Sequence, residues 1–236
     1  MDELQRAFAR MGGWLLIVLA GAWIAGCGGA SATPEPTPAP TVAPTPAPAL
    51  KILAVGDSLT EGLGVASDEA YPAQLERALR AGGYDVAVVN AGVSGETSSG
   101  TLQRIDWLLQ QQPDIVILAI GGNDGLRGID PALTEQNIDK LVERIQATDA
   151  VIVLAGMEMV RNLGSDFVSD FRAVYPRVAE RRGVMLMPFL LEGVAADRAL
   201  NQPDFIHPNA DGYAEVVKNL LPYAVQAIAE IQGRAQ

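Results

Sequence analysis

Cysteine and histidine are almost absent from this sequence: each occurs once among 236 residues, as Cys27 and His207. A single cysteine excludes an intramolecular disulfide, and it also excludes a zinc site built from several cysteines. Because histidine is the commonest metal ligand in proteins, its scarcity leads us to expect no bound metal. A reaction that needs an imidazole base at neutral pH has only His207 to use.

Basic residues are also in short supply. The chain has 17 lysines and arginines against 28 aspartates and glutamates, which gives a net charge of −11. Such a surface repels the phosphates of nucleic acids and the headgroups of anionic lipids. We therefore expect no nucleic-acid partner, and any attachment to a membrane must depend on something other than charge.

The first 27 residues do not fit a folded domain. Arg6 and Arg10 precede an apolar stretch over 14–25, and small residues lead directly into Cys27. The apolar stretch is too short to cross a bilayer core of about 30 Å comfortably, so the pattern indicates an export signal. Small residues before a lone cysteine resemble a bacterial lipoprotein signal. We predict a lipoprotein-type signal peptide over 1–27, with a lipid on Cys27 that anchors the exported protein on the extracytoplasmic face of a bacterial membrane.

Residues 28–49 have the composition of a disordered linker. They are rich in proline, threonine and alanine, and proline takes every second position over 34–40 and 44–48. Alternating proline favours the extended polyproline conformation at about 3.1 Å per residue, so this stretch could hold a domain up to about 70 Å from an anchor. An unanchored tail would have the same composition, and the two interpretations differ only in what Cys27 carries.

From residue 50 to the end, short apolar runs alternate with amphipathic stretches. A nearly continuous apolar run indicates a strand covered on both faces, and alternation of strands with helices favours a parallel sheet between helical layers. We predict one domain over 50–236, a three-layer α/β/α sandwich with a five-stranded parallel sheet. The expected strands are 51–55, 85–90, 114–120, 150–155 and 184–187, and the expected helices are 71–81, 98–111, 133–148, 166–182 and 209–232.

Polar clusters follow the expected strands. Ser58 follows the first strand, Gly95 the second and Asn123 the third, while Asp204 and His207 lie in the loop before the last helix. In parallel sheets the ligand crevice forms beyond the carboxyl ends of the strands. We therefore expect these five residues to meet at one edge of the sheet.

These residue types are the ones that acyl transfer requires. A serine hydroxyl becomes a nucleophile when a base removes its proton, and His207 is the one imidazole available. Asp204 lies three residues earlier and can fix the tautomer of His207 by accepting a hydrogen bond from the far ring nitrogen. The Asn123 amide and a glycine backbone N–H can donate to an oxyanion, although composition does not decide between Gly92 and Gly95.

The sequence resembles a known family at these positions. Four segments are similar, in their order, to the four blocks of the SGNH, or GDSL, hydrolases, and most of all to the branch of bacterial thioesterase I and the arylesterases. They are Gly56-Asp57-Ser58-Leu59, the loop around Gly95, Gly122-x-Asp124 around Asn123, and Asp204-x-x-His207. One position departs from the family: Phe205 stands where these enzymes often have glycine between the acid and the base.

The resemblance implies a flavodoxin-like SGNH hydrolase fold and no cofactor. It also implies a catalytic triad and an oxyanion hole. The implied triad has Ser58 as nucleophile, His207 as base and Asp204 as the orienting acid. The implied oxyanion donors are the N–H groups of Ser58 and Gly95 and the side chain of Asn123.

We predict an exported lipoprotein esterase that hydrolyses small acyl esters through an acyl-enzyme intermediate, with thioesters and lysophospholipids as further candidates. Two alternatives also fit the sequence. A carbohydrate O-deacetylase acting on extracytoplasmic polysaccharide would use the same residues on acetyl groups alone. A non-catalytic binding lipoprotein would keep the crevice for recognition. We expect a monomer that needs only a small ester substrate and water.

Overall fold

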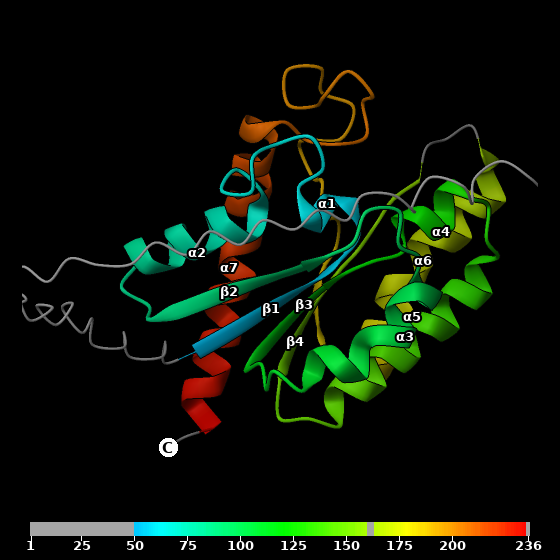
Figure 1. Cartoon of the computed structure of the whole chain (residues 1–236). Helices are drawn as coiled ribbons and strands as arrows, with labels where there is room; N and C mark the ends of the chain where they lie inside the picture. The colour runs from blue at the N-terminus through cyan, green and yellow to red at the C-terminus, as the bar shows by residue number, and fades with distance from the viewer. Residues whose placement is uncertain (1–49, 160–162, 235–236) are drawn as a thin grey trace, which may run out of the picture. The chain divides into compact units, whose positions relative to one another are not determined.

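Five parallel strands lie at the centre of the part of the chain that the computed structural model describes, residues 50–159 and 163–234. They follow the order β2-β1-β3-β4-β5, and Figure 1 labels the first four of them. Their bounds are β1 (Leu50–Gly56), β2 (Val86–Gly92), β3 (Ile115–Ala119), β4 (Val151–Ala155) and β5 (Met185–Met187). The signal peptide predicted over 1–27 and the linker predicted over 28–49 lie outside the described residues.

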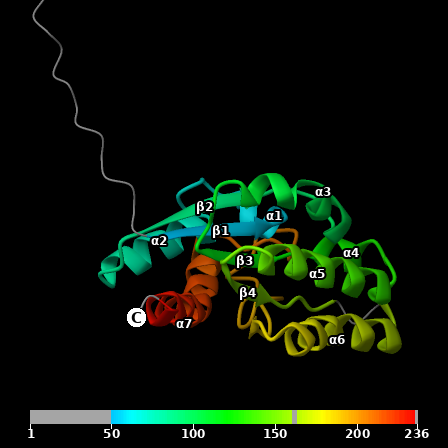
Figure 2. The ribbon, with the colours of Figure 1, turned by 90° about the horizontal axis from the view of Figure 1, so that it is seen from below.

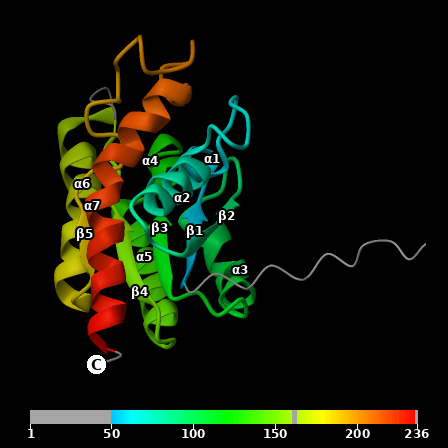
Figure 3. The same cartoon turned by 90° about the vertical axis from the view of Figure 1, so that its left-hand side faces the viewer.

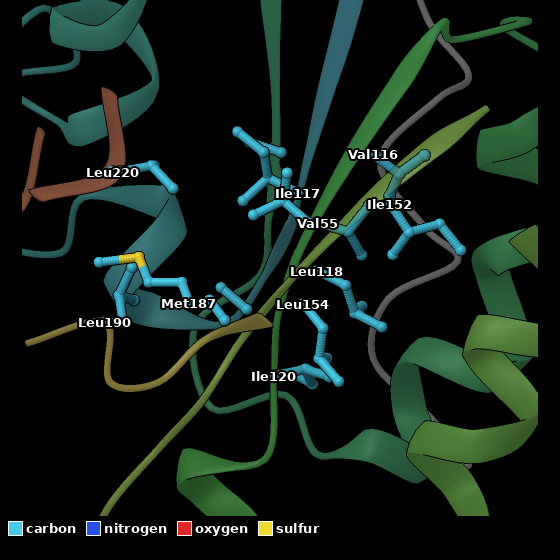
Figure 4. Close-up of a cluster of buried hydrophobic side chains, with 14 of the residues drawn as sticks. Val55, Val116, Ile117, Leu118, Ile120, Ile152, Leu154, Met187, Leu190 and Leu220 are labelled. Atoms are coloured by element: carbon cyan, nitrogen blue, oxygen red, sulfur yellow. The ribbon is translucent and has the colours of Figure 1, made fainter. Parts of the chain in front are cut away.

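The three central strands, β1, β3 and β4, are buried on both faces, as their apolar runs predict. Every residue of β3 and β4 is buried, and so are the last five residues of β1. Figure 4 shows aliphatic side chains of these three strands, among them Val55, Ile117 and Leu154, in the cluster that also contains Leu220 of the last helix. A strand covered on both faces requires a helical layer on each side of the sheet.

Helices form these two layers. The seven helices within the described ranges are α1 (Ser58–Glu61), α2 (Tyr71–Ala81), α3 (Ser98–Leu109), α4 (Gly122–Leu126), α5 (Pro131–Gln146), α6 (Ser165–Arg182) and α7 (Ala210–Arg234). Helices α2 and α7 pack together on one face of the sheet, and α3, α5 and α6 pack together on the other (Figure 2). The predicted α/β/α sandwich with a five-stranded parallel sheet is confirmed.

Local sequence explains where the longer helices begin. The Thr97 side chain caps α3 by accepting a hydrogen bond from the Gly100 N–H, and the Asp130 side chain caps α5 by accepting one from the Ala132 N–H. Pro131 follows Asp130 at the first helical position, where the missing N–H is not needed. Within the described ranges no helix combines the length and the apolar character needed to cross a membrane.

The strand order puts a topological switch point between β1 and β3. The chain runs from β1 to β2 on one side and then crosses to β3 on the other, so the loops after β1 and β3 diverge from neighbouring strand ends. Gly56 at the end of β1 pairs in register with Ala119 at the end of β3. In open parallel sheets with this order, ligands bind at this topological switch point.

Both ends of the described chain lie at the opposite edge of the sheet, where the strands begin. Leu50 is the first residue of β1, and the Arg234 guanidinium at the end of α7 donates a 2.9 Å hydrogen bond to the Asp149 carbonyl just before β4. Figure 3 shows α7 running along the sheet from the loops at one edge to the C-terminal end at the other. The chain therefore enters and leaves the domain on the side away from the switch point.

Candidate active site

Ser58 is placed by a tight turn between β1 and α1. It is the first residue of α1 and is 8% exposed. The turn needs glycine at position 56, because a Cβ there would lie 2.2 Å from Thr60 Oγ1 and 2.4 Å from the Ala119 carbonyl oxygen. The Asp57 carboxylate caps α1 by accepting a 3.0 Å hydrogen bond from the Leu59 N–H. The serine hydroxyl is thus held at the switch point by the first block of the sequence.

Ser58, His207 and Asp204 form a continuous chain of hydrogen bonds. Ser58 Oγ lies 2.8 Å from His207 Nε2, and His207 Nδ1 lies 2.7 Å from Asp204 Oδ2. With Nδ1–H donating to the carboxylate, Nε2 carries a lone pair that can accept the serine proton. The three side chains span 149 residues of sequence and have the geometry of a serine activated by a base.

The loop before α7 fixes the orientation of the acid. Asp204 Oδ1 accepts 3.0 Å hydrogen bonds from the backbone N–H groups of Ile206 and His207. Desolvation favours the neutral carboxyl, but these two hydrogen bonds and the one from the His207 ring outweigh it and lower the pKa of Asp204 to about 2. Asp204 is therefore a carboxylate throughout the neutral pH range.

The loops after β2 and β3 present the candidate oxyanion donors. Within residues 50–159 and 163–234 the Gly95 N–H has no hydrogen-bond partner, and the Ser58 N–H is one of the free donors at the start of a helix. The Gly92 N–H donates to Asn90 Oδ1 at 2.9 Å, so it is already used. Of the two glycines that the sequence left open, Gly95 is the one with a free donor.

Cross-links between loops hold these donors near Ser58. Asn123 Nδ2 donates to Asp57 Oδ2 at 3.1 Å, which leaves its second hydrogen free for another acceptor. The Arg127 guanidinium at the end of α4 donates to the Gly95 carbonyl at 2.7 Å. The loops after β1, β2 and β3 are thus tied to one another, and all five residues predicted for the site lie at the carboxyl edge of the sheet.

Sequence analysis gave no role to three groups that support the site, of which Asp124 and Asp57 are buried and Arg104 is partly buried. Asp124 is fully buried; it accepts a 2.8 Å hydrogen bond from the Ser98 N–H and a second bond from the Ser98 hydroxyl. Arg104 pairs with Glu96 and donates to the Ala91 carbonyl at 2.8 Å, beneath the loop that carries Gly95. A sequence signal exists for Asp124, which lies within the third family block, but none indicates the partners of Arg104.

The third missed group is Asp57, which is 1% exposed. Burial raises the pKa of Asp57 from 3.8 to about 6, although the hydrogen bonds from the Leu59 N–H and the Asn123 amide lower it. Its place between Gly56 and Ser58, directly before a helix, is the signal that could have identified it as a cap.

The raised pKa of Asp57 predicts a pH-dependent stability. Between pH 3.8 and about 6 the folded state binds a proton at Asp57 more strongly than the unfolded chain does. The free energy of unfolding should therefore fall as pH rises through this window, by up to about 3 kcal/mol from this group. We expect Asp57→Asn, which keeps an acceptor for the Leu59 N–H, to remove this part of the slope.

The measurement is urea unfolding of wild type and Asp57→Asn at several pH values from about 3.5 to about 7.5, a range that extends beyond both ends of this window. Asp68→Asn, which changes an exposed carboxylate, serves as the control and should keep the wild-type slope. Parallel pH profiles for wild type and Asp57→Asn would show that Asp57 does not titrate as described.

The chain is similar to known esterases in sequence and in fold. The model of the GDSL-like lipase/acylhydrolase family matches residues 54–215. Esterase TesA of Pseudomonas aeruginosa is 38% identical over 175 residues, which are 74% of this chain and 87% of that protein. Thioesterase 1/protease 1/lysophospholipase L1 of Escherichia coli K12 is 38% identical over 161 residues, 68% of this chain and 76% of its own. The solved structure of a psychrotrophic esterase EstA from Pseudoalteromonas superposes with a TM-score of 0.72 at 30% identity, and the match covers 76% of this chain and 98% of EstA.

Proposed function

This chain belongs to the GDSL-like lipase/acylhydrolase family and hydrolyses acyl esters, and we propose that Ser58, His207 and Asp204 carry out the reaction. The observation that carries this proposal is the chain of hydrogen bonds at 2.8 and 2.7 Å that links the serine hydroxyl, the imidazole and the carboxylate. Because the relatives named above include esterases, a purely binding role and a role restricted to carbohydrate acetyl groups are not needed to explain the site.

The first half of the reaction acylates the enzyme. Ser58 Oγ attacks the acyl carbon while its proton moves to His207 Nε2, and Asp204 stabilises the resulting imidazolium. The oxygen of the tetrahedral intermediate accepts hydrogen bonds from the N–H groups of Ser58 and Gly95 and from the Asn123 amide. His207 then gives the proton to the leaving oxygen, the ester C–O bond breaks, and the alcohol departs from the acyl-enzyme.

The second half repeats these steps with water. A water molecule gives a proton to His207 Nε2 and attacks the acyl carbon, and the tetrahedral oxyanion uses the same donors. Collapse of the intermediate breaks the bond to Ser58 Oγ, which takes the proton back from His207. The products are a carboxylic acid and the free enzyme, so the reaction consumes only ester and water.

Labelling with a phosphonate tests the role of Ser58. A p-nitrophenyl alkylphosphonate should release p-nitrophenol and leave one phosphonyl group on the peptide that contains Ser58, as mass spectrometry would detect. His207→Ala should label much more slowly, because the hydroxyl then lacks its base. An active enzyme that carries the label on a different residue, or carries none, would contradict the assignment.

We further propose that the substrates include thioesters and lysophospholipids. The support is the name of the Escherichia coli relative and the exposed apolar side chains at this edge of the sheet, which are Leu126 at the end of α4 and the loop residues Leu63, Val93, Phe205 and Ile206. Rates on p-nitrophenyl esters from acetate to palmitate, followed by a palmitoyl thioester and a lysophosphatidylcholine, test this. Activity confined to acetate would overturn it.

We also propose that a lipid on Cys27 anchors the protein on the extracytoplasmic face of a bacterial membrane. The support is the sequence of residues 1–27, with its short apolar stretch before a lone cysteine. Wild type expressed in bacteria should partition into the detergent phase of Triton X-114, and Cys27→Ala should not. Equal partitioning of the two proteins would contradict the lipid anchor.

A further inference from the structure

Three apolar side chains lie exposed on the loops beside His207. They are Leu63, Phe205 and Ile206, which are 44%, 49% and 43% exposed. The Gln202 side-chain amide ties their loops together by donating to the Leu63 carbonyl at 2.6 Å and to the Pro208 carbonyl at 3.0 Å. We refer to Leu63, Phe205 and Ile206 as the His207 rim.

Phe205 adopts a backbone conformation that disfavours a side chain. Its φ is 58°, in the left-handed region, where a residue with a Cβ is less stable than glycine. Gln112 and Ala196 are the other non-glycine residues with positive φ in the described ranges, and neither lies between the proposed acid and base. Strain of this kind at a site suggests that the side chain serves a function.

A cation holds the exposed ring of Phe205. The guanidinium carbon of Arg198 lies 5.3 Å from the ring centroid, within the range of a cation–π interaction. Within residues 50–159 and 163–234 Arg198 makes no ion pair and no hydrogen bond. Its one interaction within those residues is therefore with the ring, and this contact restricts the motion of an aromatic group that is half exposed.

The chemistry of the site assigns this rim to one part of the substrate. His207 Nε2 lies 2.8 Å from Ser58 Oγ, and the same nitrogen must protonate the leaving oxygen of the ester. The alcohol therefore departs past His207, while the acyl group stays bound to Ser58. Phe205 and Ile206, which directly precede His207 in the chain, are therefore the candidates for contact with the alcohol rather than with the acyl chain.

We propose that Phe205 is a specificity-determining residue that, held by Arg198, selects esters whose alcohol carries an aromatic ring. This inference rests on the proposed roles of Ser58 and His207. A ring of the alcohol packs against Phe205 in the offset or edge-to-face arrangement that aromatic pairs favour. A saturated ring of the same size buries a similar area but lacks this additional attraction.

Two acetate esters isolate this effect. Benzyl acetate and cyclohexylmethyl acetate share the acyl group and have alcohols of similar size, but only one ring is aromatic. We expect the wild-type chain to have the higher kcat/KM for benzyl acetate. Phe205→Leu keeps an apolar side chain on the same backbone and should lower the benzyl to cyclohexylmethyl ratio about fivefold. Trp107→Leu, which removes an exposed ring on α3, should leave the ratio unchanged.

Two further variants separate recognition from a structural role. Arg198→Met keeps an apolar stem but frees the ring, so the ratio should fall in the same direction by a smaller factor. Phe205→Gly relieves the positive φ, so the variant should be at least as stable as wild type in urea and should still lose the preference. A Phe205→Gly variant that loses stability and keeps the wild-type ratio would overturn the proposal.

The remaining outcomes distinguish this proposal from the proposed function. If wild type hydrolyses both acetates and Phe205→Leu leaves their ratio unchanged, the role of Phe205 is overturned and the esterase mechanism stands. If wild type hydrolyses neither ester and the phosphonate does not label Ser58, both proposals are overturned.

Discussion

Replacing Ser58 with alanine should lower kcat for p-nitrophenyl butyrate by about 10⁴- to 10⁶-fold. The 2.8 Å contact between Ser58 Oγ and His207 Nε2 is the only described route by which a hydroxyl at this crevice can lose its proton to an imidazole, since the chain has one histidine. His207→Ala should give a loss of similar size. The two residues act as a unit, so the double variant should be no slower than either single variant.

Steady-state rates of the purified variants, corrected for spontaneous hydrolysis, give this result. Thr148→Ala, which changes a hydroxyl between α5 and β4 at the opposite edge of the sheet, should keep wild-type kcat. Substantial activity in Ser58→Ala would mean that another nucleophile attacks the ester. Losses that multiply in the double variant would mean that Ser58 and His207 act independently.

Replacing Asp204 with asparagine should lower kcat by about 10³-fold and change KM little. The asparagine oxygen can still accept the N–H groups of Ile206 and His207 in place of Asp204 Oδ1, so the loop should keep its shape. Its NH₂ group would then face His207 Nδ1 and favour the tautomer with the proton on Nε2, which cannot accept the serine proton. The Asp204 side chain is 45% exposed. We therefore expect a smaller loss of kcat than the loss of about 10⁴-fold that is typical when the acid is buried.

The pH profile of kcat/KM provides a second measurement of the role of Asp204. With its pKa lowered to about 2, Asp204 stays ionised down to strongly acidic pH, so the titration of Asp204 should not appear in the profile at neutral pH. Asp197→Asn is a matched control, because Asp197 also accepts a backbone N–H, that of Ala199, in the same loop. Full activity in Asp204→Asn would show that the imidazole needs no carboxylate in this enzyme.

The sequence predicted the longer strands and helices, whose apolar patterns extend over several residues. Runs such as 115–119 and 151–155 are apolar at every position, and such runs occur where both faces of a strand are covered. Helices α1 and α4 were not predicted, because helices of four and five residues are too short to show a repeating apolar face. The helix expected over 98–111 ends at Leu109, where the chain turns through Gln112, whose φ is 52°, before Pro113.

The positions of the site residues could be predicted because topology fixes them, whereas their supporting contacts could not. Any residue directly after a parallel strand comes to the carboxyl edge of the sheet, which is sufficient to bring Ser58, Gly95 and Asn123 together. The bond from Asn123 to Asp57 joins positions 66 residues apart, and no periodicity records which side chain will meet which. The positive φ of Phe205 likewise depends on the closed loop around Asp204 rather than on the residue type.

The location of both chain ends has a practical consequence for immobilisation. A support or a fusion partner attached before Leu50 or after Arg234 meets the domain where the strands begin, and Ser58 lies beyond the far end of β1. An enzyme coupled to a solid surface through either end therefore keeps Ser58 turned toward the bulk liquid. Random coupling through lysines offers no such control, and oriented coupling should retain a larger share of the activity per bound molecule.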